Sequence, residues 1–137
     1  MTNGTIPLYL TFLAAIVFGA TLLAIQPYSV TSPWHSYDQP ARLYLRAAAR
    51  RDSLALARRT ATDEAAHWAL EAGRAQPDSV ALWAREAKAW AGNRRGDTTE
   101  VFLSTRASTA CNLVLRFVGS GTGVKVSRAS SSCLGAR

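Results

Sequence analysis

The first 37 residues contain no aspartate, glutamate, lysine or arginine, so every charged side chain except that of a protonated His35 lies from Asp38 onward. The whole chain has 16 basic and nine acidic residues, and its formal net charge is +7. It has no Cys-x-x-Cys-His motif, which excludes covalent attachment of a c-type haem. No glycine-rich loop follows a strand and opens a helix, so a nucleotide-binding loop of that kind is also excluded. We therefore expect no bound cofactor.

The uncharged region contains a largely apolar run of 20 residues, Ile6 to Ile25. A helix of this length spans roughly 30 Å, the thickness of the hydrocarbon core of a bilayer. A cleaved signal peptide is the alternative, but the run is too long for one and has no positive residues before it. The sequence therefore predicts a transmembrane anchor over residues 1–26, an interfacial linker over 27–39 and an extramembrane domain over 40–137.

Small residues recur every four positions along the predicted anchor. They lie on one helix face at Thr11, Ala15 and Gly19, and the same spacing returns at Ala20 and Ala24. Small residues let a second membrane helix approach closely, although an alanine-rich span also contains such pairs by chance. The anchor has no ionisable side chain, which predicts packing against other integral-membrane subunits and no proton or ion pathway.

Two further groups of residues are candidates for contacts near the membrane. Aromatic side chains after the anchor are typical of an interfacial belt, and we assign to it Tyr28, Trp34, His35 and Tyr37. Arginines follow on one helix face and just beyond it: Arg42, Arg46, Arg50 and Arg51. Such a stripe suits an acidic partner or anionic lipid, and a solvated helix face is the alternative. Nucleic acid is not expected, because the aromatic residues are not interleaved with the arginines.

Two features of the sequence disagree about the side of the membrane on which the domain lies. Arg42 and Arg46 favour the cytoplasm by the positive-inside rule. Cys111 and Cys133 favour the periplasm if they form a disulfide, because disulfides persist in oxidising compartments. In the last predicted strand the expected buried residues are Val124 and Val126, and Cys133 has the opposite parity, so a bond requires a bulge or a turn near 130–132. Two buried free thiols are the alternative. We expect a bacterial inner-membrane protein whose domain faces the periplasm.

The extramembrane sequence changes from helical to strand periodicity along its length. Helices are predicted over Ala41–Ala49 and Ser53–Arg59, with N-caps at Asp38 and Asp52, and further helices start at Thr62 and span Ser79–Trp90. In the last of these, the spacing predicts a buried stripe of Val80, Trp83, Ala87 and Trp90. The segment 92–96 is read as a polar turn. Strands are predicted over Thr99–Thr105, with Val101 and Leu103 on one face, and over Cys111–Val118 and Val124–Arg128. This order predicts an α+β fold in which about four helices pack on a three-stranded antiparallel meander.

Two segments carry a resemblance to a known fold family. The helix–Asp–helix opening ARLYLRAAARRDSLALARRT and the terminal hairpin VLRFVGSGTGVKVS resemble cystatin-like domains of the nuclear-transport-factor-like superfamily. The sequence departs from that family by a fourth helix where further strands are usual. The resemblance implies a curved sheet, and the family contains both enzymes and non-catalytic binding modules, so it does not decide the function.

His67 is the best candidate for a reactive group, because Glu64 and Glu71 lie on the same helix face. A Glu-x-x-His pair is half of a di-iron site, and the chain has no second copy. A zinc site needs three or four ligands, so we expect a structural histidine and no metal site. No serine or cysteine nucleophile can be matched to a base, and we expect no catalytic residues.

These observations predict a non-catalytic accessory or scaffolding subunit of a larger integral-membrane complex. In size and architecture the chain resembles the small accessory subunits of bacterial photosynthetic reaction-centre and light-harvesting assemblies, which have one span and an extrinsic domain. The alternative is a membrane-tethered ligand-binding or enzymatic domain with a cystatin-like pocket.

Overall fold

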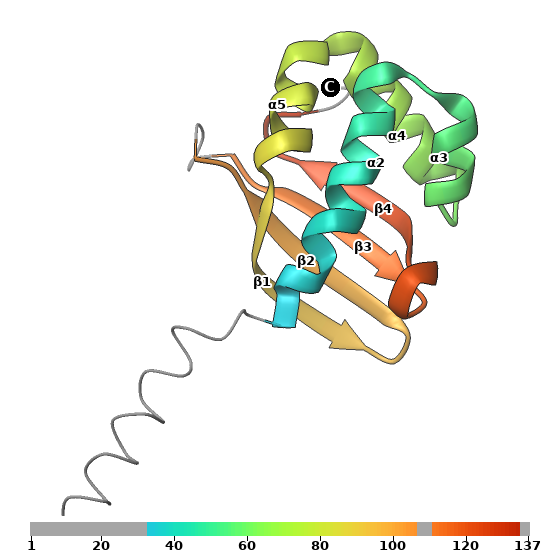
Figure 1. Ribbon diagram of the computed structural model, residues 1–137, viewed down its shortest axis with the longest axis vertical. Helices are drawn as coiled ribbons and strands as arrows, with labels where there is room; N and C mark the ends of the chain where they lie inside the picture. The colour runs from blue at the N-terminus through green and yellow to red at the C-terminus, as the bar shows by residue number, and fades with distance from the viewer. Residues whose placement is uncertain (1–32, 107–110, 135–137) are drawn as a thin grey trace, which may run out of the picture. The chain divides into compact units, whose positions relative to one another are not determined.

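The computed structural model describes residues 33–106 and 111–134, which form one folded unit (Figure 1). The helical elements come first: η1 (Pro33–Tyr37), α2 (Asp38–Arg50), α3 (Ser53–Arg59), α4 (Asp63–Ala75) and α5 (Pro77–Glu86). The strands follow: β1 (Lys88–Arg95), β2 (Thr98–Ser104), β3 (Leu113–Val118) and β4 (Lys125–Ser131), with the short η2 (Gly121–Gly123) between the last two. The predicted α+β order, with helices before strands, is therefore present.

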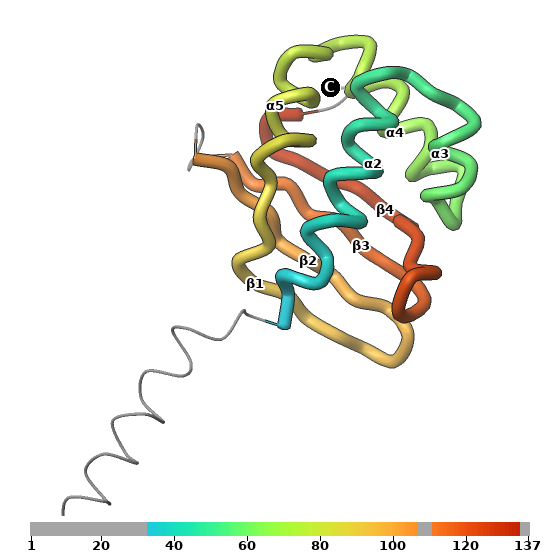
Figure 2. Tube along the Cα trace, in the orientation of Figure 1, coloured from blue at the N-terminus to red at the C-terminus, as the bar shows by residue number. Residues whose placement is uncertain are grey.

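The four strands form one antiparallel sheet in the order β1-β2-β3-β4, which the chain follows as a simple meander (Figure 2). Burial alternates along β2 and β3, so one face of the sheet is covered and the other is left open. The covered face carries Val101, Leu103, Leu115 and Phe117, which are buried together with side chains of the helices. The helices therefore pack on one face only, as one-sided antiparallel sheets allow.

The helical side of the core is built from unusually small side chains around a few large ones. Tyr44, Leu45 and Trp83 are buried, and most of the other buried helical residues are alanines. The Tyr44 hydroxyl donates a hydrogen bond of 2.7 Å to the carbonyl oxygen of Ala65, which joins α2 to α4. Small residues let the helices approach one another and the sheet closely, as close packing of a core requires.

The predicted starts of two helices are confirmed by their capping bonds. The Asp52 carboxylate accepts a hydrogen bond from the amide of Ala55, and the Thr62 hydroxyl accepts one from the amide of Ala65. The prediction that Asp38 caps the first helix is wrong, because Asp38 lies inside α2 and its carboxylate bonds to His35 and Ala89. α2 ends at Arg50, and the next residue, Arg51, caps it in the left-handed conformation with a φ of 51°.

The prediction of three strands is wrong, because the sheet has four. The predicted fourth helix ran to Trp90, but α5 ends at Glu86 and the segment 88–95 is strand β1. Gly92 and Asn93 are poor helix formers, and in the structure they pair with β2. The turn expected over 92–96 is confined to Gly96 and Asp97, where Gly96 has a φ of 62°.

The predicted transmembrane anchor is also corrected. Within 33–106 and 111–134, no helix is long and apolar enough to cross a membrane. The longest of these helices have 13 residues, which corresponds to about 20 Å and is shorter than a hydrocarbon core of about 30 Å. The run Ile6 to Ile25 lies outside the described residues. We therefore do not retain the single-pass anchor or the inner-membrane, periplasm-facing location.

Gly73 marks the closest approach between two helices and gives a test of this packing. A Cβ atom at this position would overlap the backbone carbonyl of Ala48 in α2. We expect Gly73→Ala to lower the free energy of unfolding by about 1–3 kcal/mol, because α2 and α4 must separate. Urea denaturation measures this change. Gly123→Ala is the matched control, since no atom lies within 4 Å of its added methyl group; unchanged stability of Gly73→Ala would contradict the packing.

Tyr44 gives a pH-dependent test of the same core. Burial raises the pKa of its hydroxyl above the ordinary value of 10.0. The unfolded chain therefore loses this proton at a lower pH than the folded domain. The contribution to stability is complete below pH 10.0 and is lost as the pH rises above that value. Tyr44→Phe should cost about 0.5–1.5 kcal/mol at neutral pH and remove this alkaline loss. Urea titrations at neutral and alkaline pH compare the two proteins; equal slopes against pH would refute the assignment.

Candidate functional site

The candidate residues of the predicted anchor cannot be placed. They lie outside the described residues: Thr11, Ala15, Gly19, Ala20, Ala24 and Tyr28. The candidates that can be placed all belong to the folded unit, in η1, α2 and the strand ends. The site is therefore built from the domain's own surfaces.

The two aromatic side chains of η1 pack within the domain. Trp34 lies against β1 at Gly92, where an added Cβ would come within 2.5 Å of the Cε3 atom of the indole. Tyr37 contacts Phe117 with ring centroids 5.1 Å apart, and its hydroxyl donates to the Thr99 hydroxyl over 3.1 Å. Both rings thus help to attach η1 to the covered face of the sheet.

Asp38 connects three elements through its carboxylate. One oxygen accepts a hydrogen bond of 2.7 Å from the amide of Ala89 in β1. The other lies 3.1 Å from Nδ1 of His35 in η1. The position predicted as a helix cap is instead a link between the start of α2 and the first strand.

The arginine stripe on α2 separates into two kinds of residue. Arg42 is half-buried, and its Nε donates to the carbonyl oxygen of Ala87 over 3.0 Å. Arg46, Arg50 and Arg51 are exposed, and no ion pair joins them to another described residue. Arg42 is therefore held in place, whereas the other three remain solvated in this structure.

A bulge in β1 places Trp90 on the open face of the sheet. Ala89 pairs with Leu103 and Ala91 pairs with Phe102, so Trp90 is the extra residue between them. The Trp90 side chain is 57% exposed, although it contacts the Phe102 ring at 5.9 Å between centroids. We call Trp90 and Phe102 the aromatic patch. Its position on the uncovered face, at the β1 edge of the sheet, makes it the main candidate for a contact surface.

Charged residues lie beside the aromatic patch on the same face. Glu100 pairs across the strands with Arg116, and Arg116 pairs with Arg128. The Arg116 guanidinium donates to the Glu100 carboxylate over 3.2 Å. Arg95, which pairs with Thr98, adds an exposed positive charge at the far end of β1, whereas Arg94 pairs with Thr99, which is buried on the covered face. With three arginines and one acidic residue among these strand positions, the open face is positive beside the aromatic patch.

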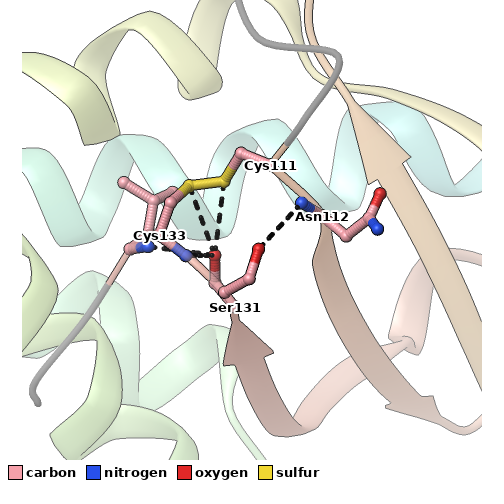
Figure 3. The surroundings of a disulfide bond; sticks show 6 residues. Cys111, Asn112, Ser131 and Cys133 are labelled. Carbon is pink, nitrogen blue, oxygen red and sulfur yellow. Dashed lines mark hydrogen bonds between the residues drawn. A yellow bond between two sulfur atoms is a disulfide. The ribbon is translucent and has the colours of Figure 1, made fainter.

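The two cysteines form a disulfide that joins the start of β3 to the chain after β4 (Figure 3). Their Cα atoms are 5.7 Å apart. The parity conflict in the sequence is resolved by a bulge: Phe117 pairs with Val126 and Arg116 with Arg128, so Ser127 is an extra residue. The bulge shifts the alternation by one position.

The bend after β4 is held by Ser131. Its hydroxyl accepts hydrogen bonds from the amides of Cys133 and Leu134, at 3.2 and 3.0 Å. The hydroxyl also lies 3.6 Å from the Cys111 sulfur and 3.7 Å from the Cys133 sulfur (Figure 3). The bend therefore brings Cys133 back toward β3.

The histidine and glutamates of α4 do not form a metal-binding arrangement. His67 is exposed, and Glu71 is hydrogen-bonded to Arg74 over 2.7 Å, which lowers the pKa of the Glu71 carboxyl group. Glu64 lies 3.8 Å from Arg128 of β4. The described part of the chain contains no group of three or more side chains suited to hold a metal ion.

Comparisons of the chain with protein families, with curated proteins and with solved structures found no match in any of the three. The cystatin-like and photosynthetic resemblances therefore stay predictions from sequence. The sequence analysis missed the aromatic patch, because Trp90 was assigned to a buried helical stripe. The signal that could have revealed it is the Gly-Asn pair directly after it, which argues against a helix at this point.

Removal of the disulfide gives a quantitative test of how much this bond stabilises the domain. The bond closes a loop between residues 22 positions apart, and such a cross-link stabilises a fold by about 2–4 kcal/mol. We expect the double substitution of Cys111→Ser and Cys133→Ser to lower the free energy of unfolding by this amount in urea titrations. Dithiothreitol should destabilise the wild type and leave the double variant unchanged. If the wild type is shown to be reduced and its free energy of unfolding is unchanged, the stabilising role of the disulfide is contradicted.

Proposed function

We propose that the domain is a non-catalytic accessory subunit that docks onto a larger assembly through the open face of its sheet. The observation that carries this proposal is the exposed Trp90 side chain supported by Phe102. In an antiparallel sheet with one covered face, the other face is usually polar. Here the open face carries the aromatic patch at its β1 edge.

The composition of this face resembles the energetic centre of a protein interface. Tryptophan and arginine are enriched among residues that dominate binding energy. Trp90 offers a large apolar surface, and the neighbouring ring of Phe102 restricts its movement. Arg116 is held by Glu100 beside it, so part of the entropic cost of ordering that side chain is already met before binding. This favours docking of a preformed surface.

The charge around the aromatic patch indicates the chemistry of the partner. The chain carries a net charge of +7, and the open face contributes Arg95, Arg116 and Arg128 to it. An acidic protein surface with an apolar centre would be complementary, and complementary charge raises the association rate and the selectivity. We therefore propose an acidic protein partner.

The packing of the covered face argues for docking over the alternative, a ligand pocket between the helices and the sheet. That space is occupied by Tyr44, Leu45 and Trp83 from the helices and by Leu103 and Phe117 from the sheet, all of which are buried. A cystatin-like ligand would need some of this volume. The open face needs no such rearrangement to make contacts.

Co-purification from the native source with a mild, quantitative affinity procedure tests the proposal. We expect stoichiometric protein partners with the wild type and a loss of at least about tenfold with Trp90→Ala, a change typical of an interface centre. Leu54→Ala is the matched control, because Leu54 is 72% exposed on α3, away from the sheet. A wild type that is recovered without partners, or Trp90→Ala that keeps them, would refute the proposal.

A further inference from the structure

A basic pocket lies at the junction of α5, β1 and the end of β2, and the proposed docking does not use it. Its volume is about 320 Å³. We call it the basic pocket and define it by its lining residues: Arg42, Arg85, Glu86, Lys88, Ser104, Thr105 and Arg106. Four of the seven are cationic and one is acidic. The pocket therefore concentrates about three net positive charges in a small space.

Arg42 is the fixed element of this pocket. It projects from the first half of α2, is half-buried, and donates its Nε–H to the carbonyl oxygen of Ala87. This bond orients the planar guanidinium and uses only one of its five donors. The terminal amino groups remain available, and a guanidinium presents two such donors in parallel to the oxygens of a carboxylate or phosphate.

The positive charges of the pocket are not neutralised by the domain itself. No ion pair joins Arg42, Arg85, Lys88 or Arg106 to a described acidic residue. Glu86, the acidic residue of the pocket, pairs with none of them, and its Oε2 atom is buried without a hydrogen-bond partner among the described residues. Like charges placed together repel one another, and a bound anion would remove this repulsion.

We propose that the basic pocket binds a phosphate group. A phosphate monoester carries about −1.5 to −2 charges near pH 7 and three strong acceptor oxygens. It can therefore accept two hydrogen bonds from the oriented Arg42 fork and further ones from other donors that line the pocket. A single carboxylate offers one charge and two oxygens, which leaves about two positive charges of the pocket unbalanced.

Titration of the intact protein with inorganic phosphate, followed by NMR at constant ionic strength with chloride as the replaced ion, tests this site. The Arg42 side-chain Nε–H signal and the amide signals of Lys88 and Ser104 should shift together and saturate. Arg42→Gln should weaken binding by about tenfold or more, because it removes charge-assisted hydrogen bonds. Glycerol 3-phosphate, the headgroup fragment of phosphatidic acid, should bind more tightly than inorganic phosphate if the natural ligand is a lipid headgroup, and no more tightly if it is free phosphate.

Further variants separate a specific site from general attraction to a basic protein. Lys88→Gln removes one pocket charge from an exposed side chain that pairs with no acidic group among the described residues, so it should weaken binding even if Arg42→Gln fails to fold. Arg58→Gln, on the exposed part of α3, is the matched control and should bind as the wild type does. Shifts that do not saturate, equal affinity of Lys88→Gln and the wild type, or acetate binding as tight as phosphate would overturn the proposal.

Discussion

The hydrogen bond from the Ala89 amide to the Asp38 carboxylate is the contact on which the arrangement of the domain depends most directly. It connects the first turn of α2 to β1, and the same carboxylate holds His35 of η1. Ala89 is the residue immediately before the bulge, so the bond fixes the point at which the strand changes its alternation. Ala89 is consequently buried and Trp90 is turned to the open face.

Small side chains explain how so many helices fit over a narrow sheet. At Gly73 the backbone of α4 comes so close to the carbonyl of Ala48 that no side chain can be present. Gly92 plays the corresponding part in β1, where the indole of Trp34 occupies the position of a side chain. An aromatic ring over a strand glycine restores apolar contact that the glycine lacks. The alanine-rich composition, which only indicated helix in the sequence, therefore also sets the spacing of the layers.

The sequence predicted those elements whose signals are local. The helix over Ser53–Arg59 and its Asp52 cap are present as predicted, and so is the inward face of Val101 and Leu103. β1 was missed because Val80, Trp83 and Ala87 are indeed buried at helical spacing, and Trp90 continues that spacing by coincidence.

The functions of Asp38 and of the cysteines depend on residues distant in sequence. The Asp38 bond joins positions 51 residues apart, and the parity of Cys133 depends on a bulge at Ser127 that the structure places against α4, where the Thr62 hydroxyl donates to the Ser127 carbonyl. No local periodicity contains that information.

The aromatic patch and the basic pocket arise in the same way, since both are made by strand register. Lys88 and Ser104 pair directly across β1 and β2, two positions from Phe102 along the strand. The pocket and the patch are thus neighbours, within the roughly 10 Å over which charges interact at moderate salt. A phosphate in the pocket would reduce the positive field that attracts an acidic partner, so the two proposed ligands would oppose each other's binding through that field.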